Sequence, residues 1–71
     1  MDILVFKTSV DSLQSVKTLE PLLDLVAGRG RWNFALDDSD KILRIASGNI
    51  SVQSTIRLLQ ENGYECAELE D

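Results

Sequence analysis

Apolar and polar residues follow two different periods along the chain, and these periods divide it into strand-like and helix-like segments. Ile3 to Thr8 is rich in β-branched and aromatic residues and is apolar without interruption as far as Phe6, which predicts a central strand. Trp32 to Leu36 places large apolar residues alternately with Asn33 and Ala35, the period of a half-buried strand. Two β-strands are therefore expected well apart in the chain.

The segment between these strands has the three- and four-residue spacing of an amphipathic helix. Asp11 is the predicted N-cap, with Gln14 three residues later completing a capping box, and Gly28 is the predicted C-terminal cap. Pro21 removes a backbone donor inside this helix, so we expect a kink or a break near Glu20. The predicted apolar stripe consists of Leu13, Val16, Leu19, Leu23 and Val26.

A turn at Asp38-Ser39-Asp40 is predicted to join the strand at Trp32 to Leu36 to a further strand at Lys41 to Ala46. Such a short connection implies an antiparallel hairpin. Along the later strand, Leu43 and Ile45 are expected on one face. Ile42 and Arg44 are then expected on the other.

The last part of the chain repeats the helix-then-strand pattern. Ser51 is the predicted N-cap of a helix from Ser51 to Asn62, and Tyr64 to Leu69 is the final strand. The order strand, helix, strand, strand, helix, strand predicts one α+β domain over residues 1–71. We expect a ferredoxin-like β-α-β-β-α-β sandwich, with a four-stranded antiparallel sheet and two helices on one face.

Composition narrows the function classes. Seven basic residues against twelve acidic ones give a net charge of −5, which disfavours nucleic acid and anionic membrane surfaces as partners. The chain has one cysteine and no histidine, so we predict no enzyme activity and no cofactor. The first residues are too short an apolar run for a secretory signal, and we expect a cytoplasmic location.

The single cysteine, Cys66, falls in the predicted final strand. A cysteine there is expected to be a small buried apolar residue. The alternative is a redox or intersubunit thiol, but Glu65 and Glu68 lie close to it in the sequence, and negative charge nearby disfavours the thiolate.

Several of these features together resemble the heavy-metal-associated domain found in copper chaperones and in the N-terminal modules of metal-transporting ATPases. They are the element lengths, the strand Trp32 to Leu36 after a glycine-ended helix, and the closing helix before Gly63. The resemblance implies a Gly-Met-x-Cys-x-x-Cys loop that holds a soft metal ion. The two cysteine positions fall on Ser12 and Ser15, beside Asp11, give or take one residue.

Serine hydroxyls are hard, protonated groups near neutral pH and are poor ligands for Cu(I) or Zn(II). We therefore predict no metal site at Asp11, Ser12 and Ser15, and interpret this loop as a helix cap. The alternative is a metal-ion-binding or metallochaperone-like protein that uses these oxygen ligands, or a bridging pair of Cys66 thiols. A further alternative is a small-molecule sensor similar to the amino-acid-binding ACT domains, which share this order of elements.

The face of the sheet away from the helices is the predicted contact surface. If Phe6 points to the helices, then Ile3, Val5 and Lys7 point outward, and Ile42 and Arg44 join them from the neighbouring strand. An exposed apolar cluster framed by cations is typical of a contact surface. A register shifted by one residue would exchange the two faces. We therefore predict a non-catalytic module that binds a protein partner or a second copy of itself through the open sheet face.

Overall fold

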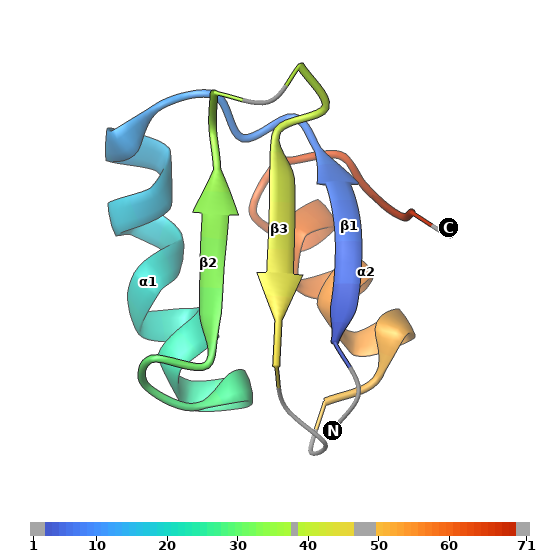
Figure 1. Cartoon of the computed structure of the whole chain (residues 1–71). Helices are drawn as coiled ribbons and strands as arrows, with labels where there is room; N and C mark the ends of the chain where they lie inside the picture. The colour runs from blue at the N-terminus through green and yellow to red at the C-terminus, as the bar shows by residue number, and fades with distance from the viewer. Residues whose placement is uncertain (1–2, 38, 47–49, 70–71) are drawn as a thin grey trace.

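The computed structural model describes residues 3–37, 39–46 and 50–69. The predicted order of elements is confirmed (Figure 1), and the elements are β1 (Leu4–Thr8), α1 (Leu13–Ala27), β2 (Trp32–Ala35), β3 (Ile42–Ile45), α2 (Val52–Glu61) and β4 (Cys66–Glu68). Turns occupy residues 36–37 and 39–40, between β2 and β3. Asp38, which belongs to the predicted turn, lies outside the described residues.

The four strands form one antiparallel sheet in the order β2-β3-β1-β4. The first strand is therefore central, as its uninterrupted apolar run predicts, and β3 is the other central strand. In Figure 1 α1 lies alongside β2 at the edge of the sheet, and α2 lies behind β3 and β1. Both helices pack on the same face of the sheet, because buried residues of each belong to one core cluster with Phe6 and Leu43. The chain has the α+β class that the sequence predicts.

The register of the strands decides which side chains face the helices. Phe6 is paired with Leu43, which is paired with Phe34. Side chains on a strand alternate between the two faces, so these three share one face of the sheet. It is the face that the helices cover, called the covered face below. Phe6 and Leu43 are fully buried there.

Both helices contribute to a single hydrophobic core on this face. Leu19, Leu23 and Ala27 from α1 and Leu59 from α2 are buried in the same cluster as Phe6. Fully burying a leucine or phenylalanine side chain contributes about 1.5–3 kcal/mol, so these contacts hold the two helices to the sheet. Two residues of the predicted helical stripe lie outside this cluster, namely Leu13 and Val26, which are exposed.

The N-cap of α1 lies one residue later in the chain than predicted. Ser12, and not Asp11, is the N-cap of α1: its backbone is extended, and its side chain accepts a hydrogen bond from the Ser15 N–H at 3.1 Å. Both residues can cap a helix, and the extended conformation that a cap requires falls at Ser12. Ser51 caps α2 in the same way, as predicted, with a bond of 3.1 Å from Ser54 N–H.

Helix α1 continues through Pro21 to Ala27, so of the kink or break expected near Glu20, the break is wrong. A proline inside a helix costs about 3 kcal/mol. The turns that follow it bury Leu23 and Ala27 against the sheet, and this burial offsets that cost. The helix ends as predicted at Gly28, whose φ of 101° suits glycine and whose N–H donates to Asp24. Within the described residues, neither helix is long and apolar enough to cross a membrane.

Candidate functional site

The loop that the resemblance assigns to a metal is used to start α1. The Ser12 hydroxyl donates to the Ser15 hydroxyl at 3.0 Å and accepts from the Ser15 N–H. Asp11 beside them is exposed. These hard oxygen atoms do not fit a soft metal ion. Among the described residues, no three His, Cys, Asp or Glu side chains gather as a metal site would require.

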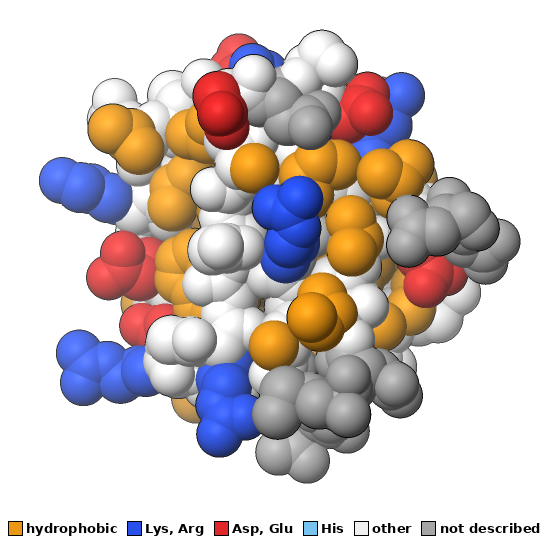
Figure 2. Space-filling view, in the orientation of Figure 1, with side chains coloured by type: hydrophobic (Ala, Val, Ile, Leu, Met, Phe, Trp, Pro, Cys, Tyr) orange, Lys and Arg blue, Asp and Glu red, His pale blue; other side chains and the backbone are white. Residues whose placement is uncertain are grey.

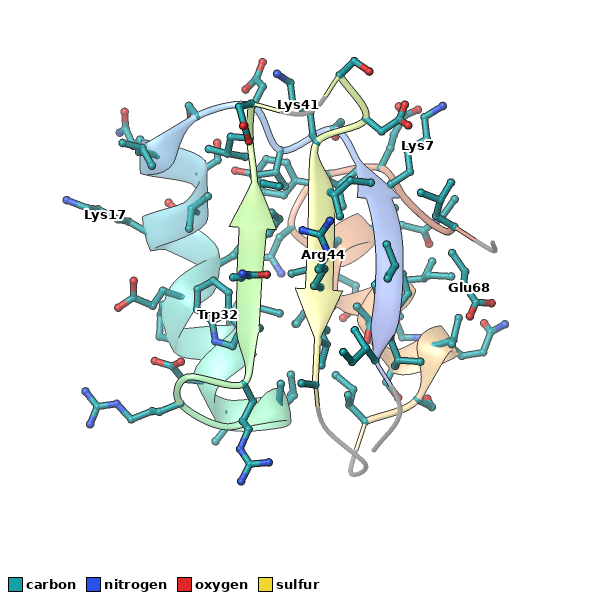
Figure 3. All side chains as sticks on the ribbon, in the orientation of Figure 1. Lys7, Lys17, Trp32, Lys41, Arg44 and Glu68 are labelled. Carbon is teal, nitrogen blue, oxygen red and sulfur yellow. The ribbon has the colours of Figure 1, made fainter. Side chains whose placement is uncertain are left out.

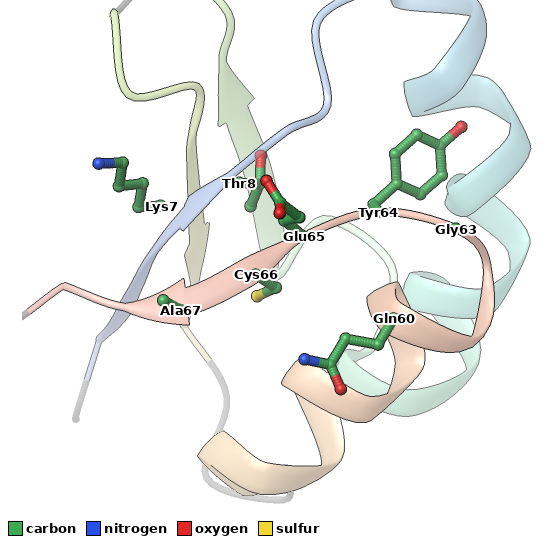
Figure 4. A pocket seen from close by; sticks show the side chains of 8 residues that line it. All are labelled: Lys7, Thr8, Gln60, Gly63, Tyr64, Glu65, Cys66 and Ala67. Atoms are coloured by element: carbon green, nitrogen blue, oxygen red, sulfur yellow. The ribbon is translucent and has the colours of Figure 1, made fainter.

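Cys66 lies on β4 beside an open groove of about 630 Å³ (Figure 4). Gln60, Tyr64 and Glu65 are among the residues that line this groove. The thiol is buried, and burial raises its pKa from 9.0 to about 11. It therefore stays protonated at neutral pH, and the thiolate that nucleophilic chemistry or metal binding needs is disfavoured. The interpretation of Cys66 as a buried apolar residue is confirmed.

The side of the sheet without helices is called the open face here. Its residues alternate with those of the core and have no place in the core cluster. From edge to edge they are Arg31, Asn33 and Ala35 near or on β2, Ile42, Arg44 and Ala46 along β3, Ile3, Val5 and Lys7 along β1, and Ala67 and Leu69 along β4. Figure 2 shows a cationic side chain at the middle of this face, with apolar side chains gathered along one side of it.

Four of the five predicted contact residues are accessible on the open face. Ile3 is 60% exposed, Lys7 and Arg44 are exposed, and Val5 is half-buried. Ile42 is only 3% exposed, so the expectation of an exposed Ile42 is wrong. Its position explains the burial, since it lies on a central strand directly between Lys7 and a residue of β2. The long aliphatic part of a lysine can cover such a neighbour.

Arg31 is a residue of the open face that the sequence interpretation did not include there. Its carbonyl accepts a hydrogen bond of 2.7 Å from Ala46 N–H, which extends the pairing of β2 and β3 by one residue. Arg31 therefore shares a face with Asn33, whose partner across the strands is Arg44. The signal was present in the alternation of polar Arg31 and Asn33 with Trp32 and Phe34.

Three cations cross the open face in a diagonal, called the cationic diagonal below: Arg31, Arg44 and Lys7. Arg31 lies opposite Ala46, and Lys7 lies opposite Ile42. Ala46 and Ile42 lie two residues from Arg44 on either side, so each cation is one strand and two residues away from the next. Figure 3 shows Arg44 in front of β3 at the centre of the sheet and Lys7 near one end of β1. Only Lys7 has an ion-pair partner among the described residues, namely Asp40 at 3.9 Å.

A shallow groove of about 290 Å³ lies at the arginine end of this diagonal. Its lining includes the polar residues Arg31, Asn33 and Arg44 and the apolar residues Ile3, Trp32 and Ala46. The strand beneath it is anchored to α1, because the Trp32 Nε1–H donates to Asp24 Oδ1 at 2.8 Å. Neither guanidinium has an ion pair within the part of the chain that the structure describes.

No family model, curated protein or solved structure matches the chain.

Proposed function

We propose that this chain is a non-catalytic binding module that contacts a protein partner, or a second copy of itself, through the open face. The observation that carries the proposal is the composition of that face. Accessible apolar side chains of Ile3 and Val5 lie beside the exposed cations Lys7 and Arg44, on a side of the sheet that has no helix. Apolar groups beside charged ones are typical of surfaces that bind other proteins.

The fold proposed for this module is the ferredoxin-like β-α-β-β-α-β sandwich. Its support is the interleaving of the two halves, since β1 lies between β3 and β4, and β3 lies between β1 and β2. The resemblance to heavy-metal-associated domains stays a proposal that rests on element lengths and on the glycine-ended first helix. We propose no metal role for it, because the Ser12 and Ser15 hydroxyls bond each other and cap α1.

Charge supports a protein as the partner. A net charge of −5 repels a nucleic acid or an anionic membrane as a whole, and few cations on the open face oppose that repulsion. A cytoplasmic location belongs to the proposal as well, supported by the free thiol of Cys66.

The test compares the wild type with Val5→Glu, which places a charge in the middle of the open face. Gln53→Glu adds the same charge at an exposed position of α2 and serves as the matched control. Light scattering at high protein concentration measures self-association, and mass spectrometry identifies proteins that co-purify from the source organism. We expect an assembly or a partner that is lost in Val5→Glu and kept in Gln53→Glu. A wild type that stays monomeric and carries no partner contradicts the proposal.

A further inference from the structure

We propose that the cationic diagonal docks an acidic segment of the partner protein, with one carboxylate held between Arg31 and Arg44 in the groove that they line. The inference rests on the proposed function, and it names the chemistry of the partner. The segment that fits combines carboxylates, which meet the cations, with apolar side chains, which meet Ile3 and its apolar neighbours.

The spacing of the diagonal suits successive carboxylates. Neighbouring strands lie about 4.8 Å apart and residues two apart along a strand are separated by about 6.7 Å, so successive cations of the diagonal start about 8 Å apart. Long side chains on such diagonal positions reach one another. The guanidinium groups of Arg31 and Arg44 can therefore converge on a single carboxylate, and Asn33, which lies directly across from Arg44, adds a neutral donor beside them.

The two arginines are available for this role because nothing else on the described chain uses them. Neither has an ion pair, whereas the Lys7 ammonium lies 3.9 Å from Asp40. Guanidinium groups bind carboxylates in a bidentate manner, which fixes orientation as well as adding affinity. The arginine end of the diagonal is therefore the recognition end.

Apolar flanks favour a protein segment over a nucleic acid. Ile3 is 60% exposed and Leu69 is 38% exposed, and both lie on this face beside the cations. Phosphate binding is strengthened by many cations, and exposed aliphatic groups add nothing to it. This face has three cations on a chain of net charge −5. An extended segment in which acidic and apolar residues alternate matches both features.

A second copy of the chain is the less suitable occupant. A face-to-face pair of copies centred on Arg44 would bring the two cationic diagonals together. Like charges that oppose each other across an interface disfavour association. The observations therefore favour a different protein with an acidic segment.

The experiment titrates the ¹⁵N-labelled protein with three probes and follows backbone amide and arginine Nε–Hε resonances. The probes are a blocked pentapeptide of alternating glutamate and leucine, the same peptide with lysine in place of glutamate, and inorganic phosphate. We expect the acidic peptide to bind and to shift resonances of Arg31, Asn33 and Arg44. Arg31→Gln and Arg44→Gln should each weaken binding about tenfold, because each removes a charge-assisted hydrogen bond.

The matched control is Arg57→Gln, which makes the same charge change at an exposed position of α2. Its affinity for the acidic peptide should stay within twofold of the wild type, and dispersed spectra should show that all variants fold. Equal weakening in Arg57→Gln overturns the proposal, because net charge alone would then explain binding. Phosphate that binds as tightly as the peptide, or a lysine peptide that does so, also overturns it.

Two other outcomes separate this inference from the proposed function. If both arginine variants keep full affinity but Val5→Glu loses it, the open face binds while the arginine groove does not, and the inference is overturned. If no probe binds, the inference is overturned as well. The proposed function is decided independently of that result by light scattering and co-purification.

Discussion

The two faces of the sheet are built from the same strands and have opposite surroundings. On β1, Phe6 points to the helices and is fully buried, while the adjacent Val5 points away and is half-buried. On β3, Leu43 is fully buried and Arg44 is exposed. One face joins sheet and helices, and the other presents side chains to the surroundings.

Stability within the chain therefore depends mainly on one side of the sheet, and the proposed binding belongs to the other side. Substitutions on the covered face remove contacts with two helices, whereas substitutions on the open face remove few contacts within the chain. The open face can therefore carry charges such as Arg44 at little cost in folding free energy. Four predictions test how far this separation holds.

The largest difference is expected between Phe6→Ala and Val5→Ala. Removing the fully buried Phe6 ring should lower the free energy of unfolding by about 3–5 kcal/mol, much of the roughly 4–10 kcal/mol expected for a domain of this size. Val5→Ala should lower it by at most about 1 kcal/mol. Urea denaturation followed by circular dichroism measures both values, and equal losses would contradict the separation of the faces.

Ile42 departs from the contrast between the two faces. It belongs to the open face, yet it is only 3% exposed. Ile42→Ala should therefore lower the free energy of unfolding by about 2–3 kcal/mol, near the lower end for buried isoleucines because a surface position can partly collapse. A loss as small as that of Val5→Ala, measured by urea denaturation, would show that Ile42 adds nothing to stability.

Thr8 tests the polar part of the covered face. Its hydroxyl donates to the Lys41 carbonyl at 2.6 Å and accepts from Val10 N–H at 3.2 Å, and the residue is buried. Thr8→Val keeps the shape and leaves both backbone groups without that partner, so we expect a loss of about 1–3 kcal/mol. Thr18→Val at an exposed position of α1 is the control and should change stability by less than about 0.5 kcal/mol. Thermal and urea unfolding should both show a larger loss of stability for Thr8→Val than for Thr18→Val.

The titration of Cys66 has almost no effect on stability at neutral pH, because the thiol is protonated there in both the folded and the unfolded chain. Its pKa is about 11 in the folded chain and near 9 when the chain unfolds, so the folded state binds more protons between these values. The resulting stability is fully present below pH 9 and is lost as the pH rises through 11. Under reducing conditions, the free energy of unfolding should fall more steeply from pH 8 to 11 in the wild type than in Cys66→Ala. Parallel curves for the two proteins would contradict this.

Local chemistry explains what the sequence predicted correctly. The apolar run of β1 indicates a central strand, Gly28 supplies the positive φ that ends α1, and the Ser51 hydroxyl reaches the Ser54 N–H within one turn. Each of these depends on a few neighbouring residues. They suffice to predict the order of elements and the class of fold.

The remaining features depend on residues far apart in the chain. The burial of Ile42 follows from its neighbours on two other strands, and the continuity of α1 through Pro21 follows from packing against the sheet. Arg31 joins the candidate site only because β2 and β3 pair one residue beyond their regular ends. Adjacent Asp11 and Ser12 are both capping residues, and their sequence positions alone do not decide between them.

The central position of β1 also bears on how the chain folds. Both neighbours of β1 come late in the sequence, and β1 is paired through Leu4 with Ile45 and through Phe6 with Glu68. During synthesis this apolar strand emerges before either partner strand, whereas the hairpin of β2 and β3 has its two strands close together in the chain. Closing a long loop costs more entropy than closing a hairpin. The first strand is thus the one most exposed to wrong pairing in a nascent chain, until the last strand is complete.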